Sequence, residues 1–237
     1  QSVNARFADP GWRRKVDGIA RGLAGLPPKL DPYLYASALW CFRTIRACGG
    51  LGIFCHPYWV TKRRYHIPGS LADHVFAEQP YDAYEVIGGY HRWEAESNAL
   101  QAVRYHEETL RGKRIPVVGV SDAHGCERGE LFGWYFTIVF AASPALDDLI
   151  GAIKDLRSVA VEALPGAPVQ VYGPMRLVKY AHFLLREFFP GHDALCREEG
   201  EAMFAHLGGD SRAREALASL QGRTLEHHRR RAAPGCV

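Results

Sequence analysis

Side chains that can bind metals or move protons end or interrupt three apolar runs of the sequence. His56 ends the first run, and Glu85 lies inside the second. Asp122 and His124 end the third run, two positions apart. In α/β folds, ligands bind at the carboxyl ends of parallel strands. If the three runs are parallel strands, these four side chains converge at one edge of a sheet.

Carboxylates and imidazoles gathered in one place are suited to a divalent metal ion. In an extended segment Asp122 and His124 point to the same face, so both can coordinate one metal or two adjacent metals. Glu85 is surrounded in sequence by aromatic and β-branched residues, which predict a buried strand. An unpaired buried carboxylate costs several kcal/mol, so Glu85 needs a cation or a network of donors. Together, the three positions favour a metal or catalytic site.

Each of these residues also has a purely structural interpretation. His56 precedes a proline and can be a core or turn histidine. Asp122 can cap a turn, and Glu85 can pair with an arginine such as Arg92. The occurrence of all of them at three successive strand ends is what distinguishes the metal-site hypothesis from these alternatives.

Apolar runs alternate with helical patterns over residues 35–163, and this order predicts the fold class. Helices are expected over 13–23, 35–48, 69–78, 93–112 and 145–156, and strands over 51–55, 81–87, 115–121, 134–141 and 158–163. Continuous apolar strands bounded by helices indicate a parallel sheet covered by helices. The expected class is therefore α/β, as either a β/α barrel or a doubly wound sheet.

The pattern changes after residue 165, where helical segments follow one another without strands. Helices are expected over 174–188, 192–207 and 211–222. The sequence thus predicts a β/α domain over 1–165 and a C-terminal helical region with a tail over 166–237. The run His227–Arg231 is expected to be a solvated end of the chain.

Composition excludes several classes of protein. A hydrophobic fraction of 47% over 237 residues is enough for a core, and it is not that of a disordered chain. The net charge of +3 gives no argument for nucleic acid or an anionic membrane as a partner. No apolar run approaches the length of a transmembrane helix, and the first residues show no signal-peptide core. The cysteines form no C-x-x-C pair and are expected to be mostly free thiols, which favours a cytoplasmic setting: Cys41, Cys48, Cys55, Cys126, Cys196 and Cys236.

Three short motifs resemble the later motifs of the PHP (polymerase and histidinol phosphatase) superfamily. They are FCHPYW at 54–59, YEVIGG at 84–89 and VVGVSDAHG at 117–125, and the resemblance covers residues 35–165. It implies a distorted β/α barrel that binds divalent metals at the carboxyl ends of its strands and hydrolyses phosphoesters. The substrate expected from this resemblance is a small phosphorylated molecule or a nucleotide. Mixed histidine and carboxylate ligands suit zinc, manganese and iron alike.

The resemblance also assigns expected roles to individual residues. His56, Asp122 and His124 would be metal ligands, with Asp122 and His124 catalytic in hydrolysis by metal-activated water. Glu85 would be a further ligand or a partner that orients a ligand histidine. Basic residues follow two of the strand ends, where they would bind the phosphate oxygens or belong to solvated loops: Lys62, Arg63, Arg64 and Arg92.

One feature of the PHP pattern has no counterpart in this sequence. The pattern opens with a histidine-x-histidine on the first strand, whereas no histidine precedes His56 here. The chain is therefore expected to be the later part of a longer protein, or else a degenerate member of the superfamily. The alternative to an enzyme is a non-catalytic binding or regulatory module on the same scaffold, with the C-terminal helices as its interaction surface.

Overall fold

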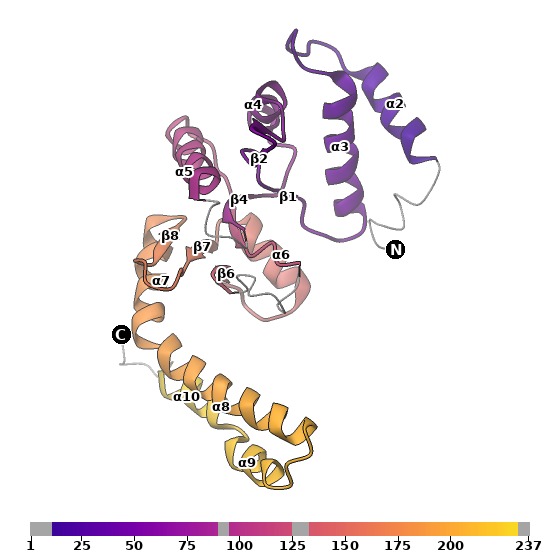
Figure 1. Cartoon of the computed structure of the whole chain (residues 1–237). Helices are drawn as coiled ribbons and strands as arrows, with labels where there is room; N and C mark the ends of the chain where they lie inside the picture. Colours follow the sequence, from indigo (N-terminus) through magenta and orange to yellow (C-terminus); the bar gives the residue numbers. More distant parts are fainter. Residues whose placement is uncertain (1–10, 90–94, 125–132, 232–237) are drawn as a thin grey trace. The chain divides into compact units, whose positions relative to one another are not determined.

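The computed structural model describes residues 11–89, 95–124 and 133–231 (Figure 1). The chain divides into two compact units, Gln1–Val178 and Lys179–Val237. Its helices and strands are, in chain order, α2 (Trp12–Gly22), α3 (Pro32–Ala47), β1 (Ile53–Phe54), β2 (Val60–Thr61), β3 (Arg64–Tyr65), α4 (Gly69–Glu78), β4 (Ala83–Gly88), α5 (Ala95–Leu110), β5 (Val117–Val120), β6 (Tyr135–Val139), α6 (Leu146–Lys154), β7 (Ser158–Glu162), β8 (Gln170–Tyr172), α7 (Met175–Glu187), α8 (Phe189–Leu207), α9 (Ala213–Leu220) and α10 (Arg223–Arg231).

A parallel sheet of β1, β4 and β5 forms the centre of the first unit, with β4 in the middle. Phe54 of β1 pairs with Tyr84 of β4, and Tyr84 pairs with Val117 of β5. All six residues of β4 are buried, as expected for a central strand of a parallel sheet. The predicted parallel sheet is confirmed for these three strands, and their carboxyl ends meet at one edge.

Aromatic side chains fill the core beneath this sheet. The ring of Phe76 on α4 lies 5.4 Å from that of Phe54 and 5.0 Å from that of Tyr84, both in edge-to-face geometry. Tyr81 stacks against Phe54 at 5.6 Å. Such offset and edge-on pairs are the favoured arrangements of aromatic rings. This packing fixes β1 and β4 against α4 and so holds the strand ends in register.

The second sheet of the unit differs from the expected all-parallel arrangement. Strands β6, β7 and β8 pair antiparallel, so the parallel prediction is wrong for this part. Side chains, rather than a backbone ladder, join it to β5. Gly119 exchanges two hydrogen bonds with the Thr137 hydroxyl, at 3.0 and 2.9 Å, and Ser158 Oγ donates to the Val117 carbonyl at 2.7 Å. Among the described strands there are three small sheets and no closed barrel.

The helical region begins later than the sequence suggests. Strand β8 pairs with β7 through Ala160 and Tyr172, which keeps residues beyond 165 in the first unit. In the second unit α8 packs against both α9 and α10. Residues 223–231 form helix α10, so His227–Arg231 is helical, and His228, Arg229 and Arg230 are exposed as expected for a solvated end. None of the helices in the described part of the chain is both long enough and apolar enough to cross a bilayer.

Candidate metal centre

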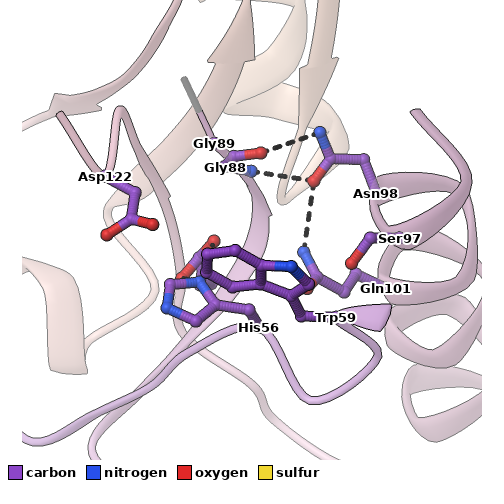
Figure 2. A pocket seen from close by; sticks show the side chains of 9 residues that line it. His56, Trp59, Gly88, Gly89, Ser97, Asn98, Gln101 and Asp122 are labelled. Atoms are coloured by element: carbon purple, nitrogen blue, oxygen red, sulfur yellow. Dashed lines mark hydrogen bonds and ion pairs between the residues drawn. The ribbon is translucent and has the colours of Figure 1, made fainter. Parts of the chain in front are cut away.

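The carboxyl ends of β1, β4 and β5 bring three of the predicted site residues to one small cavity. His56 follows β1, Glu85 lies in β4 and Asp122 follows β5. Nine residues line the cavity (Figure 2): His56, Trp59, Glu85, Gly88, Gly89, Ser97, Asn98, Gln101 and Asp122. Its interior measures about 10 Å³, which is about the space that one water molecule or one metal ion needs. A substrate larger than an ion has to lie at its mouth.

Glu85, expected from the sequence to be a further ligand or a partner that orients a ligand histidine, lies at the centre of this group. Its side chain is 1% exposed, and its Oε1 lies 3.0 Å from Nδ1 of His56. The second oxygen, Oε2, lies 2.8 Å from the same nitrogen but out of line for a hydrogen bond. Nδ1 can serve one oxygen at a time, so the buried carboxylate keeps acceptor capacity that the described residues leave unfilled.

A bulge in β4 makes room for this carboxylate. The register between β4 and β5 shifts between Glu85 and Ile87, leaving Val86 as the extra residue. The normal two-residue alternation is thereby broken, and Glu85 and Gly88 face the same side. A Cβ at position 88 would lie 2.0 Å from Glu85 Oε1, so only glycine fits here.

Gly88 is itself held by α5. Its N–H donates to Asn98 Oδ1 at 2.9 Å, and its carbonyl accepts from Asn98 Nδ2 at 2.9 Å (Figure 2). Gln101 Nε2 donates to the same Oδ1 at 3.3 Å. The buried Oε1 of Gln101 has no hydrogen-bond partner among the described residues. Thus the wall of the cavity opposite the strands is polar and contains one more unpaired oxygen.

Cys55 is a member of the site that the sequence analysis did not include. One ligand atom each from Cys55, His56 and Glu85 lies within 4.8 Å of the others. Burial, the carboxylate of Glu85 and then that of Asp122 raise the pKa of the Cys55 thiol. The raised pKa means that the surroundings disfavour a negative charge on the sulfur of Cys55. A cation bound next to this sulfur would have the opposite effect and lower the pKa of the thiol. In the sequence, the feature that could have identified Cys55 as a site residue is its position directly before His56 at the end of a strand.

Two of the site residues have a strained backbone. The φ angle of His56 is 35° and that of Asp122 is 49°, both in the left-handed region that L-residues with side chains rarely adopt. Such strain costs about 1–3 kcal/mol per residue and concentrates at functional sites. At His56 the turn breaks strand alternation, which lets Cys55 and His56 approach Glu85 together.

The same strain overturns the expected extended geometry of the third strand end. Because Asp122 is left-handed, the chain turns there, and the same-face argument for Asp122 and His124 does not hold. The two side chains still meet, with His124 Nε2 3.4 Å from Asp122 Oδ1. Asp122 is 22% exposed and lines the cavity, whereas His124 is 68% exposed and lies outside its lining. His124 thus contacts Asp122 but does not line the cavity.

The predicted phosphate-binding residues lie on a hairpin that begins at the cavity wall. Strands β2 and β3 pair next to Trp59, whose carbonyl accepts from the His66 N–H at 2.8 Å. Lys62 and Arg63 form the turn with φ angles of 51° and 65°, and Arg64 follows. All three side chains are exposed. Arg92 lies outside the described residues.

The donor set fits a metal of borderline softness. Thiolate, imidazole and carboxylate are the ligands that Zn²⁺ uses, and three protein ligands leave a position open for water or substrate. The acceptor capacity left on Glu85 and the cavity of one ion's size agree with that set. Searches against models of protein families, curated proteins and solved structures found no match for this chain.

Proposed function

We propose that the chain binds one divalent metal at Cys55, His56 and Glu85 and is a metal-dependent hydrolase of phosphoesters, of the PHP type. The observation that carries this proposal is the buried carboxylate of Glu85, which faces His56, Cys55 and a cavity of one ion's size. A buried carboxylate without a full set of partners costs several kcal/mol. A cation bound between these three side chains removes that cost.

The roles of the residues follow from their positions. Cys55, His56 and Glu85 hold the metal, and Asp122, at the mouth on the neighbouring strand, orients water and accepts its proton. When bound, a divalent metal lowers the pKa of water and polarises a phosphoryl oxygen. Lys62 and Arg63, on the hairpin that starts at Trp59, bind phosphate oxygens. The substrate is a small phosphorylated molecule or a nucleotide.

A second candidate function is a non-catalytic binding or regulatory module that uses the same metal. The observation that favours it is that the described residues gather a single group of three ligands, while His124 is not among the residues that line the cavity. One metal is enough to hold a ligand or to stabilise the fold. Hydrolysis with two metals, by contrast, neutralises both the attacking and the leaving oxygen.

An assay for metal-dependent hydrolysis separates these functions. The purified chain is incubated with Mn²⁺ or Zn²⁺ and with p-nitrophenyl phosphate or bis(p-nitrophenyl) phosphate. We expect slow, metal-dependent turnover that falls about a thousandfold or more in Glu85→Gln and Asp122→Asn. Glu162→Gln, another buried strand glutamate, is the matched control and keeps its activity.

The results of this assay separate the hydrolase from the binding module. Metal binding without turnover of either ester supports the binding module and contradicts the hydrolase. Turnover that persists in both Glu85→Gln and Asp122→Asn refutes the roles given to these residues. Absence of metal binding, measured by the metal content after dialysis, refutes both functions.

A further inference from the structure

We propose a second metal site in the other compact unit, formed by His192 and Cys196 of α8 with His228 of α10, and selective for a thiophilic divalent ion such as Zn²⁺. It lies within Lys179–Val237 and shares no residue with the metal centre of the first unit. The sequence pattern did not indicate this site, because the residues of α8 that meet His227 and His228 lie more than thirty positions earlier in the chain.

The first half of the site is one turn of α8. His192 and Cys196 are four residues apart, so their side chains lie on the same face of the helix. Helices use this spacing to present two ligands to one metal. The Nε2 atom of His192 lies 3.6 Å from Sγ of Cys196. Bonds of about 2.0–2.1 Å to nitrogen and about 2.3 Å to sulfur at a tetrahedral angle give a separation of about 3.6 Å.

Asp193 orients the imidazole of His192 for this role. Its Oδ1 lies 3.0 Å from Nδ1 of His192. A carboxylate on one ring nitrogen fixes the tautomer in which Nδ1 carries the proton, so the lone pair of Nε2 faces Cys196. In metal-binding histidines the nitrogen that does not bind the metal usually donates to a carboxylate, a backbone carbonyl or a water, and Asp193 is a partner of this kind.

The packing of α10 on α8 is set by His227. Its Nε2 donates to the carbonyl of Phe188 at 3.1 Å, and its ring lies over Gly191. A Cβ at position 191 would approach His227 Cε1 to 2.6 Å, so a larger residue there would push the two helices apart. His227 is therefore committed to helix packing and is not counted as a ligand.

This packing places His228 at the turn of α8 that carries the other two ligands. The rings of His192 and His228 are 5.2 Å apart and inclined by 32°. His228 and Cys196 are exposed, and exposed side chains change rotamer within nanoseconds. As the side chains lie in the structure, the three ligand atoms are not yet gathered around one point, so the site forms only when metal binding draws these side chains together by rotation. A water molecule completes four-coordination, as in open zinc sites.

Cobalt titration of the whole chain tests the proposal, because Co²⁺ replaces Zn²⁺ and gives a thiolate charge-transfer band in the near ultraviolet. Of the six cysteines of the chain, the two proposed ligands, Cys55 and Cys196, are expected to give that band, and single serine variants assign it. We expect Cys55→Ser to retain a band that Zn²⁺ removes by competition. The double variant Cys55→Ser with Cys196→Ser is expected to lose it.

Further variants in the Cys55→Ser background test the ligand set. His192→Ala and His228→Ala are each expected to weaken Co²⁺ binding at least about tenfold, and Asp193→Asn about tenfold. The controls are His206→Ala on the same helix and Cys48→Ser at the C-cap of α3, which leave binding unchanged. Far-UV circular dichroism verifies that each variant keeps its helices.

Three results overturn the proposal. The first is a Cys55→Ser protein with no thiolate band at saturating Co²⁺. The second is a band that survives Cys196→Ser in that background. The third is binding unaffected by both His192→Ala and His228→Ala, which would assign the ion to a thiolate alone.

Discussion

Replacing Gly88 with alanine places a methyl group where the Glu85 carboxylate lies. The new Cβ would be 2.0 Å from Glu85 Oε1, 2.8 Å from its Cδ and 2.9 Å from the carbonyl oxygen of Val120. Ordinary carbon–oxygen contact needs about 3.4 Å, so the carboxylate has to move by more than an ångström. The carbonyl belongs to β5 and cannot move without disturbing the sheet. The displaced carboxylate loses its 2.8–3.0 Å approach to His56.

The expected loss of stability in Gly88→Ala follows from the overpacking of a rigid interior. Forcing one methyl into a packed core costs about 1–3 kcal/mol, and we expect the free energy of unfolding of Gly88→Ala to fall by that amount. Displacement of a metal ligand is expected to weaken metal binding at least about tenfold, which corresponds to about 1.4 kcal/mol. Urea denaturation and calorimetric titration with Zn²⁺ measure the two effects in the same protein.

Gly18→Ala is the matched control for this substitution. Nothing lies within 4 Å of the added methyl in helix α2, and alanine favours a helix interior over glycine by up to about 1 kcal/mol. This variant is expected to be slightly more stable and to bind metal like the wild type. A Gly88→Ala protein with wild-type stability and metal affinity would refute the geometry assigned to Glu85 and the bulge in β4.

Two other predictions concern the charged side chains of Asp82 and Lys62. Burial raises the pKa of Asp82, but the Gly52 N–H and Arg46 outweigh it, and the net pKa is lowered. The stabilisation by this carboxylate is therefore present above its unfolded pKa of 3.8 and lost as the pH falls through its lower folded pKa. Asp82→Asn should flatten the pH dependence of urea denaturation in that acidic range, and an unchanged profile would contradict the assignment. Lys62→Ala should raise the substrate concentration needed for half-maximal turnover, with little change in maximal rate, whereas equal kinetics of variant and wild type would remove Lys62 from the site.

The sequence was most informative where local pattern and tertiary structure agree. Apolar runs bounded by glycine or proline predicted β1, β4 and β5, and the helix expected over 69–78 is α4. The parallel order of these strands then accounts for the meeting of His56, Glu85 and Asp122 at one edge. The topology of a parallel sheet brings its strand ends to one edge. The meeting of these residues could therefore be predicted without knowledge of side-chain contacts.

The missed features depend on contacts between distant residues. The bulge at Val86 and the left-handed turns at His56 and Asp122 give no periodic signal, yet they decide that Cys55 enters the centre and that His124 stays outside it. Strand β6 pairs antiparallel with β7 through the backbone, and the Thr137 hydroxyl ties β6 to Gly119 of β5. Apolar strands of both orientations have similar composition, so sequence alone favoured the parallel one.

In the second unit, too, the feature that the sequence did not predict depends on a contact between distant residues. Helical composition predicted α8 and α9 closely, whereas no helix was expected over α10, and His227–Arg231 within it was expected to be a solvated end. What holds it is the packing of His227 on Gly191 and its bond to Phe188. Such a contact between two helices far apart in the sequence cannot be seen in the pattern of either one.

The central claim is that one metal ion lies between Cys55, His56 and Glu85 at the carboxyl edge of the parallel sheet. The most direct test is anomalous X-ray scattering at the zinc edge from crystals of the chain grown with Zn²⁺. The account predicts an anomalous peak within bonding distance of Cys55 Sγ and Glu85, at about 2.0–2.3 Å from each ligand atom. A map with zinc bound elsewhere and no peak in this cavity would contradict it.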